Sequence, residues 1–337
     1  MERASASERT NEVEGWHTPA VIVVEVLAWA AVAVMALLVV TQLIGWSGTR
    51  FVVGLQALTP YVLGPALPIA IVAAITGRWL LAGVAAGGVA ALAVVILPLR
   101  APAAGTAPAS AMASLRIFHA NLLYLNGRTA ELARVVASLD ADVLAFTEYT
   151  LTHAGGMYVS PLASSFPYRI EYPEASAGGS ALWSRFPLTE IDAPDALYQS
   201  TAAILDVAGG VELYVVHPPN PLDHLGDWLA ELAGLADLHG VSDRPAIVTG
   251  DFNATYWYPP FRRVQAAGWR DAHQLVGRGF SSSWPNDKAW LPPIMRLDHA
   301  LIDDSLSVAE VADVDLPGSD HRGFVLTVVV SRSAAAS

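Results

Sequence analysis

Residues 246–254 read AIVTGDFNA, a short apolar run that ends in Asp251 and Asn253. The apolar part has the length and the β-branched residues of a core strand. A buried strand has no structural use for polar side chains at its tip, whereas strand tips that meet at one sheet edge form a cleft. This stretch therefore predicts a core strand that ends at a functional site.

Other apolar strands carry polar residues at their ends in the same way. These residues are Asn121 in LRIFHAN, Glu148 in DVLAFTE, His217 in ELYVVH, Asp298 and His299 in RLDHALI, and Asp320 and His321 before GFVLTVVV. Carboxylates and amides without cysteine suit a hard cation such as Mg²⁺ or Mn²⁺. Histidines beside them can transfer protons and stabilise developing negative charge. The pattern predicts metal-assisted hydrolysis of a phosphate ester.

The remaining strands and helices indicate one α/β domain. SALWS (180–184) and AAILDV (202–207) also resemble strands, and residues 128–139 and 225–238 have helical periodicity. Strands mixed with helices over residues 115–330 predict a single domain with helices packed outside the sheets.

The amino-terminal part of the chain is much more apolar than the rest. The mean hydropathy of +0.42 is too high for a purely soluble protein. Between residues 20 and 99 the only charged residues are Glu25, Arg50 and Arg78. Three apolar runs, residues 20–44, 51–76 and 79–99, each reach the length of about 20 residues that a membrane-spanning helix needs. We expect three transmembrane helices, the second kinked by its prolines.

The chain ends and the linker have a different composition. Residues 1–19 and 331–337 are predicted to be disordered tails, and residues 100–114, rich in Ala and Pro, a flexible linker. The linker sequence AMAS resembles a peptidase site, so cleavage there stays open. Three spans with this arginine distribution favour a cytoplasmic amino terminus. The chain is therefore expected to be a multi-pass protein of the cell membrane with an extracytoplasmic soluble domain.

Charge and cysteine content exclude several classes of protein. Residues 101–337 hold 14 Lys and Arg against 26 Asp and Glu, which equals the net charge of −12 of the whole chain. Such an acidic domain is not a general polyanion binder. The absence of cysteine excludes disulfides and thiolate metal sites.

Seven motifs in this order resemble a known superfamily. They are NLLYLN (121–126), FTEY (146–149), LWSRFPL (182–188), VVHPPNP (215–221), GDFNA (250–254), RLDHAL (296–301) and SDHRG (319–323). The region from Leu115 to about Val330 resembles the endonuclease/exonuclease/phosphatase superfamily, which includes DNase I, abasic-site endonucleases, sphingomyelinases and inositol-phosphate 5-phosphatases. The resemblance implies a DNase I-like four-layer α/β sandwich of two packed β-sheets flanked by helices.

The resemblance also implies a role for each site residue. It makes Glu148 the principal metal ligand for Mg²⁺ or Mn²⁺, with Asn121 and Asp320 supporting it. The implied catalytic residues are His321 as the catalytic histidine, Asp298 as the carboxylate that orients it, Asp251 and Asn253 as the pair that positions the water or leaving group, and His217 as a second histidine at the phosphate. Whether His321 is the general base or a phosphate donor stays open.

Some polar and aromatic residues have less certain roles. Asp298 could instead be a structural partner of Arg296. The other histidines are expected at the surface or in packing: His119, His153, His224, His239, His273 and His299. The aromatic residues of ATYWYPPF (254–261) and SSSWPN (281–286) form either a rim at the site or local packing.

The substrate is expected to be a phosphoester, either nucleic acid or a phospholipid or lipid-linked phosphate near the bilayer. Duplex DNA is disfavoured because the domain is acidic and Lys288 is its single lysine, although Arg262 and Arg263 could form a basic patch. No obligate protein partner is evident. A catalytically idle membrane-anchored binding or scaffold domain of the same fold is the alternative.

Overall fold

The computed structural model describes residues 19–99, 111–288 and 290–331. The chain divides into two compact units. The smaller unit consists of residues up to Leu43 together with Thr59–Ala93, and the larger unit consists of Ile44–Leu58 together with the chain from Val94 onward. Residues 1–18 and 332–337 of the predicted tails and residues 100–110 of the predicted linker lie outside the described residues. Pro19 and Ser331, which the prediction gave to the tails, instead belong to a helix and a strand.

The smaller unit is helical. It contains α1 (Pro19–Leu43), α3 (Thr59–Leu63), α4 (Ala66–Ile75) and most of α5 (Trp79–Ile96), which a short 3-10 turn, η1 (Leu97–Leu99), follows. Within the described residues, two helical stretches are long and apolar enough to cross a membrane, Val21–Leu43 and Trp79–Leu99. Each has a mean hydropathy of 2.6.

The prediction of three continuous transmembrane helices was wrong in its middle member. Residues 51–76 form no single helix but the separate helices α2 (Arg50–Ala57), α3 and α4. Proline cannot donate a backbone hydrogen bond, and Pro60 and Pro65 lie at or beside these breaks. The first piece, α2, is also amphipathic and belongs to the larger unit. Only if α2 is counted with Thr59–Ile75 would a third span result.

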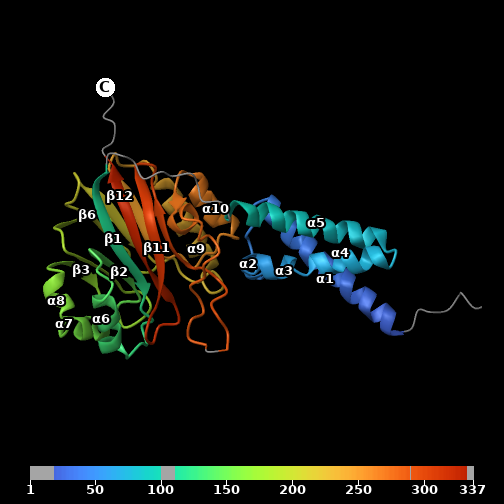
Figure 1. Ribbon diagram of the computed structural model, residues 1–337, viewed down its shortest axis with the longest axis horizontal. Coiled ribbons are helices and arrows are strands. Elements are labelled where there is room, and N and C mark those ends of the chain that lie inside the picture. Colours follow the sequence, from blue (N-terminus) through green and yellow to red (C-terminus); the bar gives the residue numbers. More distant parts are fainter. Residues whose placement is uncertain (1–18, 100–110, 289, 332–337) are drawn as a thin grey trace, which may run out of the picture. The chain divides into compact units, whose positions relative to one another are not determined.

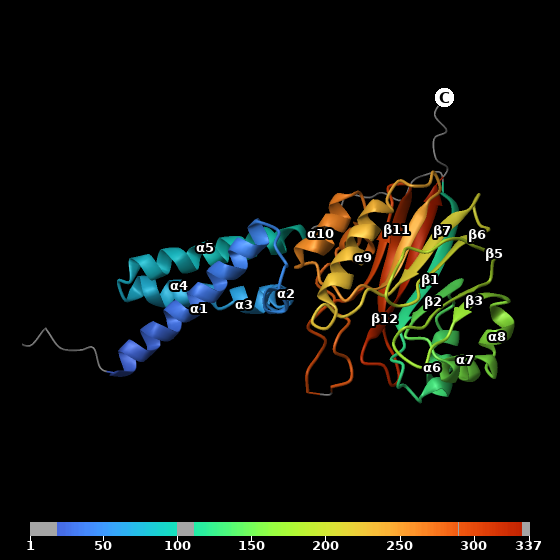
Figure 2. The same ribbon diagram turned by 180° about the vertical axis from the view of Figure 1, so that it is seen from behind.

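Among the described residues, two six-stranded sheets form the centre of the larger unit (Figures 1 and 2). The first has the order β11-β12-β1-β2-β4-β3, and the second β5-β6-β7-β8-β10-β9. The strands of the first sheet are β1 (Ala111–Asn121), β2 (Val143–Thr147), β3 (Tyr168–Tyr172), β4 (Ser180–Ser184), β11 (Leu306–Asp315) and β12 (Arg322–Ser331). Those of the second are β5 (Leu188–Glu190), β6 (Thr201–Leu205), β7 (Val211–Val216), β8 (Ala246–Asp251), β9 (Arg270–Asp271) and β10 (Asp298–Ile302).

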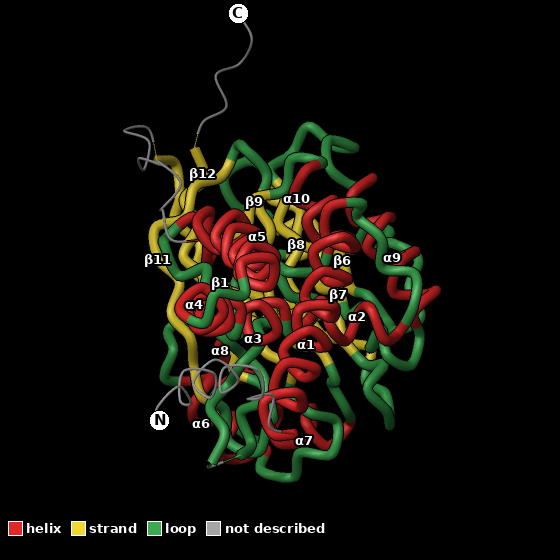
Figure 3. The backbone as a smooth tube through the Cα atoms, turned by 90° about the vertical axis from the view of Figure 1, so that its right-hand side faces the viewer, coloured by secondary structure: helices red, strands yellow, loops and turns green. Residues whose placement is uncertain are grey.

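Helices cover the outer faces of both sheets. Apolar side chains of the two sheets meet in a central core that includes Ile117, Val215 and Leu326. A second cluster lies under α6 (Thr129–Ala137), α7 (Leu151–Tyr158) and α8 (Leu162–Ser165), which group together in Figure 3. A third lies under α9 (Leu225–Asp237) and α10 (Pro259–Ala266). The short helix α11 (Ala272–Leu275) follows β9. The expected sandwich of two packed sheets flanked by helices is confirmed.

The strands and helices expected from periodicity are all present, and others were missed. The missed strand β11 lies at an edge of its sheet and carries Glu310, Asp313 and Asp315, so it lacks the apolar run of a core strand. Strand β1 starts at Ala111, inside the segment expected to be linker, because it pairs with β12 from Ala111 onward. The two parallel pairs, β1 with β2 and β7 with β8, place several strand ends at one edge.

Candidate active site

The strand register brings the predicted site residues to one edge of the sandwich. In the first sheet, Asn121 at the end of β1 pairs with Thr147, which precedes Glu148. In the second sheet, Asp251 at the end of β8 pairs with Asp298, the first residue of the antiparallel strand β10. The carboxyl ends of parallel strands and the amino ends of their antiparallel neighbours lie at the same edge. Side chains far apart in the sequence therefore meet there.

Asn121 joins the two sheets at this edge. Its fully buried amide nitrogen donates to Glu148 Oε1 at 3.0 Å and to Asp251 Oδ2 at 2.9 Å. Its own oxygen accepts the backbone N–H of Leu123. The backbone N–H of Tyr124 donates to the other oxygen of Glu148 at 2.9 Å. One amide thus holds two carboxylates from different sheets next to each other.

The backbone at this edge adopts an unusual conformation at two site residues. Glu148 and Asn253 have φ angles of 54° and 47°, in the left-handed region that side chains other than glycine rarely adopt. Strained conformations of this kind persist where the surrounding structure determines them, and they concentrate at functional sites. Here the strain accompanies hydrogen bonds that fix Glu148 and Asp251, since the backbone N–H of Asn253 donates to Asp251 Oδ1 at 2.9 Å.

Two histidines contact the carboxylate of Asp298, one at each oxygen. Nδ1 of His321 lies 2.7 Å from Oδ2, and Nε2 of His119 lies 3.1 Å from Oδ1. Asp298 and His119 have no exposed surface, and His321 is 5% exposed. The other ring nitrogen of His321, Nε2, lies 3.6 Å from Asp251 Oδ2. Asp298 therefore fixes the ring of His321 so that Nε2 faces the paired carboxylates.

The charges around His321 favour its protonated form. Burial alone would lower the pKa of His321, but the nearby charges of Asp298 and Asp251 and the hydrogen bond to Asp298 outweigh it and raise this pKa to about 10. Burial would likewise raise the pKa of Asp298, yet the two histidines hold that pKa well below its usual range. The pair is therefore ionised at neutral pH.

A third histidine, His217, lies near the same oxygen of Asp251 as His321. His217 Nε2 is 3.6 Å from Asp251 Oδ2, and its Nδ1 faces the carbonyl of Ala177 at 3.2 Å. The amide nitrogen of Asn253 donates to the carbonyl of Pro218 at 3.0 Å. The ring of Tyr198 packs against His217 at a centroid distance of 4.9 Å. These contacts hold His217 and Asn253 at the edge of the acidic group.

The loop before β12 completes the site. Trp284 Nε1 donates to Asp320 Oδ2 at 3.1 Å, and the carbonyl of Asp320 accepts the N–H of Asn286. Ser319 Oγ donates to the carbonyl of Asn121 at 2.7 Å and accepts the N–H of His321. The serine thereby ties the loop that carries His321 to the end of β1.

A pocket of about 490 Å³ opens onto these residues. Six of the eight predicted site residues line it: Glu148, His217, Asp251, Asn253, Asp320 and His321. The other two, Asn121 and Asp298, are fully buried and contact the lining residues from behind. The structure thus brings all eight predicted residues into one connected group.

The donor set of this group is compatible with a divalent cation. Ligand atoms of Asp251, Asp298 and His321 all lie within 4.8 Å of one another. Asp298, however, already binds a histidine with each oxygen and has no exposed surface. Glu148 and Asp251 could also hold an ion, because both lie in the pocket wall and one oxygen of each accepts from the amide nitrogen of Asn121. Carboxylate oxygens of this kind suit a hard ion.

Several residues differ from their sequence-based interpretation. Asp271, not Asp298, is the partner of Arg296, with Arg296 Nη2 3.3 Å from Asp271 Oδ1. His119 was expected at the surface or in packing, yet it binds the site carboxylate. Its position inside β1 resembles that of any core residue, and only its placement two residues before Asn121, on the same strand face, could have indicated the contact.

The aromatic and basic loop residues are mostly packed. Trp257 and Tyr258 are 8% and 4% exposed, and Tyr258 and Trp284 line the pocket. Arg262 donates to the carbonyls of Tyr256 and Trp257. These contacts leave local packing as the main role of the first loop.

Comparison with known proteins identifies the family of the chain. The model of the endonuclease/exonuclease/phosphatase family matches residues 117–321, more than half of the chain. The chain belongs to this family. No curated protein matches the sequence.

Solved structures of the endonuclease/exonuclease/phosphatase family share the fold. A family member from Bacteroides thetaiotaomicron is 16% identical, with a TM-score of 0.53 over 66% of this chain and 99% of that one. D. rerio TDP2 in complex with a single-strand DNA product is 17% identical, with a TM-score of 0.53 over 64% of this chain and 99% of that one. The mannosyl-6-phosphatase of Bacteroides thetaiotaomicron is 17% identical, with a TM-score of 0.51 over 64% and 99%. At this identity the likeness establishes the fold alone.

Proposed function

We propose that this protein is a membrane-anchored, divalent-metal-dependent phosphoester hydrolase. The observation that carries the proposal is the buried amide of Asn121, which holds Glu148 and Asp251 together within reach of His321. Membership of the endonuclease/exonuclease/phosphatase family supports the reaction class, because phosphoester chemistry is what the family is named for.

Glu148 and Asp251 would hold one divalent ion, Mg²⁺ or Mn²⁺, with support from Asp320 at the pocket wall. When bound, such an ion would polarise the phosphoryl oxygens and make a nearby water a better nucleophile. Asn121 acts by orienting the two carboxylates, since its amide nitrogen faces both of them while its oxygen accepts the N–H of Leu123.

His321 acts at the phosphate through Nε2. Asp298 fixes its tautomer and orientation through Nδ1. Because the surrounding carboxylates favour the protonated ring, His321 donates a hydrogen bond to the phosphoryl oxygens. Asp251, held by Asn253, positions the attacking water or the leaving group, and His217 contacts the phosphate from the other side.

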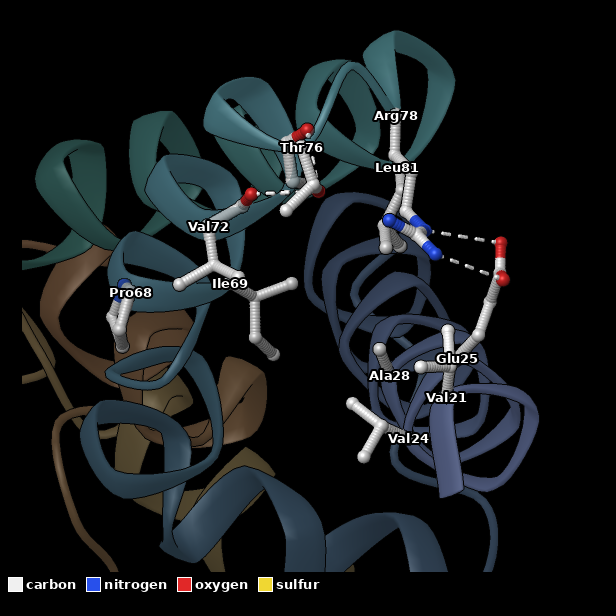
Figure 4. A pocket seen from close by; sticks show the side chains of 11 residues that line it. Val21, Val24, Glu25, Ala28, Pro68, Ile69, Val72, Thr76, Arg78 and Leu81 are labelled. Carbon is white, nitrogen blue, oxygen red and sulfur yellow. Dashed lines mark hydrogen bonds and ion pairs between the residues drawn. The ribbon is translucent and has the colours of Figure 1, made fainter. Parts of the chain in front are cut away.

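Membrane attachment is proposed from the two long apolar helices. Glu25 in α1 and Arg78 before α5 form an ion pair, with Arg78 Nε 3.3 Å from Glu25 Oε1 (Figure 4). Charged residues in apolar helices pair with one another or reach the interface. The pair supports a topology in which both residues lie at one membrane face. We propose that this face is cytoplasmic and that the catalytic unit is extracytoplasmic.

The absence of cysteine makes the topology testable. A single cysteine introduced at the exposed position Asp195 should react with a membrane-impermeant maleimide in intact cells. The protection of that cysteine until the cells are lysed would instead place the catalytic unit in the cytoplasm.

Hydrolysis of bis(4-nitrophenyl) phosphate and 4-nitrophenyl phosphate by the full-length protein in detergent tests the reaction. We expect turnover with Mg²⁺ or Mn²⁺ and its loss in Asp251→Ala and His321→Ala. Asp195→Ala and His224→Ala, on exposed residues outside the pocket, are matched controls. Because the protein has a negative net charge and would repel the DNA backbone, linear DNA should be a poor substrate. If no phosphoester is turned over under any condition, the idle scaffold becomes the better account.

A further inference from the structure

Helix α2 is part of the larger unit, although in the sequence it lies between α1 and the helices α3 and α4. Its amphipathic character explains this position. Val52, Val53, Gln56 and Ala57 form one buried face, and Thr49 caps its amino end by accepting the N–H of Val52. Val53 and Ala57 join the apolar cluster under α9 and α10.

Polar contacts fix the segment Ile44–Leu58 within this unit. Arg50 Nη2 donates to the carbonyl of Asp223 at 2.8 Å. Arg263 of α10 donates to the carbonyl of Gly45. Within the segment, Ser47 donates to Gln56 Oε1, and Gln56 Nε2 donates to the carbonyl of Trp46. The segment is therefore a structural part of the unit that carries the active site.

Residues at the carboxyl end of α2 form one wall of the active-site pocket. Gly54, Ala57 and Leu58 line the pocket together with Pro221 and Leu222 of the loop after β7. Glu148, Asp251 and His321 line the same pocket. The cavity thus combines charged side chains, which we propose bind the phosphate, with an apolar wall. Phosphate binding alone does not explain this apolar wall.

We propose that the apolar wall binds the hydrocarbon chain of an amphipathic phosphoester, so that the natural substrate carries a lipid-like chain next to its phosphate. The proposal rests on the function proposed above and specifies its substrate class. A cavity with a charged end and an apolar wall matches a ligand with the same division, because removal of each CH₂ group from water is favourable.

The chain connectivity explains why such a substrate would be available. Segment Ile44–Leu58 begins one residue after the end of Val21–Leu43, a helix long and apolar enough to cross a bilayer. If α1 crosses the bilayer, the segment starts at the bilayer surface. The segment also carries exposed apolar side chains, since Ile44, Trp46 and Phe51 are 67%, 45% and 64% exposed. Tryptophan at the end of a span is typical of the membrane interface.

Two series of esters with increasing chain length test the proposal. The first consists of 4-nitrophenyl alkyl phosphates with methyl and octyl chains, and the second of alkyl phosphate monoesters with the same chains. All are used below their critical micelle concentrations with the full-length protein in nanodiscs. We expect kcat/KM for the octyl ester to exceed that for the methyl ester at least tenfold in the series that is hydrolysed.

A substitution that fills the pocket from α2 should reduce this ratio. A Cβ atom added at Gly54 would meet nothing within 4 Å, so Gly54→Trp places its ring in the pocket without a backbone clash. We expect the octyl-to-methyl ratio to fall towards one. Gly234→Trp is the matched control, because Gly234 is also a helical glycine with free space at its Cβ and lies outside the pocket. Leu222→Asn changes the apolar lining at a second position, outside α2, and guards against misfolding of the first variant.

The outcomes separate the two proposals. Turnover with an octyl-to-methyl ratio near one, or faster turnover of a single-stranded oligodeoxynucleotide than of the octyl ester, would overturn the lipid-like substrate while leaving the hydrolase intact. An unchanged ratio in both Gly54→Trp and Leu222→Asn would also overturn it. A lack of turnover of every ester would instead contradict the proposed function itself.

Discussion

His119 and His321 bind the two oxygens of a single buried carboxylate, that of Asp298, at 3.1 and 2.7 Å. His321 belongs to the loop before β12, whereas His119 lies inside β1 and has no exposed surface. Asp298 begins β10 in the other sheet. The orientation of His321 therefore depends on a residue that cannot touch the substrate.

We predict that His119→Ala lowers kcat about tenfold and changes KM less than twofold, because Asp298 loses one of the contacts that position His321. His119→Gln should retain more activity, since its amide can donate to the same carboxylate. Steady-state kinetics on bis(4-nitrophenyl) phosphate measure both parameters. A larger change in KM than in kcat, or equal kcat for both variants, would argue against a positioning role.

Gly250, immediately before Asp251, permits close pairing of β7 and β8. A Cβ atom at this position would lie 1.9 Å from the carbonyl oxygen of Val216. Gly250→Ala should therefore lower the melting temperature by several degrees and reduce turnover more than tenfold. Gly234→Ala in α9 is the control. Alanine has a higher helix propensity than glycine, so this substitution should raise stability slightly. Similar melting temperatures of the two variants would contradict this account.

Glu231 in α9 should make stability depend on pH. Burial raises the pKa of Glu231 to about 7, Asp227 adds to the rise, and the N–H of Leu197 opposes it. The ordinary pKa is 4.5, so the folded protein keeps the proton over a range in which the unfolded chain loses it. The stabilising effect is complete below pH 4.5 and is lost as the pH rises through 7.

Glu231→Gln removes this titration while leaving an oxygen for the N–H of Leu197. We expect the difference in unfolding free energy between the variant and the wild type to be more favourable to the variant at pH 8 than at pH 5. The change should be on the order of 1 kcal/mol, because the group is partly exposed. Thermal denaturation at both pH values measures the difference. An identical effect at pH 5 and pH 8 would show that Glu231 titrates normally.

The ion pair between Glu25 and Arg78 should couple α1 to the turn before α5. Glu25→Gln and Arg78→Gln should each destabilise the protein in detergent, and the double variant by less than their sum. Because about a third of each side chain is exposed, we expect a coupling energy of about 1 kcal/mol or less. The exchanged pair, Glu25→Arg with Arg78→Glu, should recover part of the loss. Strict additivity of the single effects would mean that the pair contributes nothing.

The sequence predicted which side chains gather at one edge of the sandwich. Asp251, Asp298 and His321 stand out because polar residues interrupt apolar strands where the strands end, and strand ends share an edge. Their identities also indicate the chemistry. The same reasoning could not identify His119, because a buried histidine inside a strand resembles a core residue until its partner on another strand is known.

Helix α2 was missed for a different reason. Its residues are apolar enough to resemble the start of a second span, since hydropathy does not distinguish a face that packs on protein from one that faces lipid. The contact of Val53 with the core under α9 and α10 joins residues more than a hundred positions apart. Hydropathy read along a window of neighbouring residues carries no information about such contacts.

The proposed function requires one divalent cation between the carboxylates of Glu148 and Asp251. Anomalous diffraction from a crystal of the full-length protein grown with Mn²⁺ and phosphate tests it most directly. We predict one strong manganese peak within coordination distance of both carboxylates, with phosphate between the metal and His321. A site without manganese that binds phosphate, or a peak that contacts neither Glu148 nor Asp251, would contradict it.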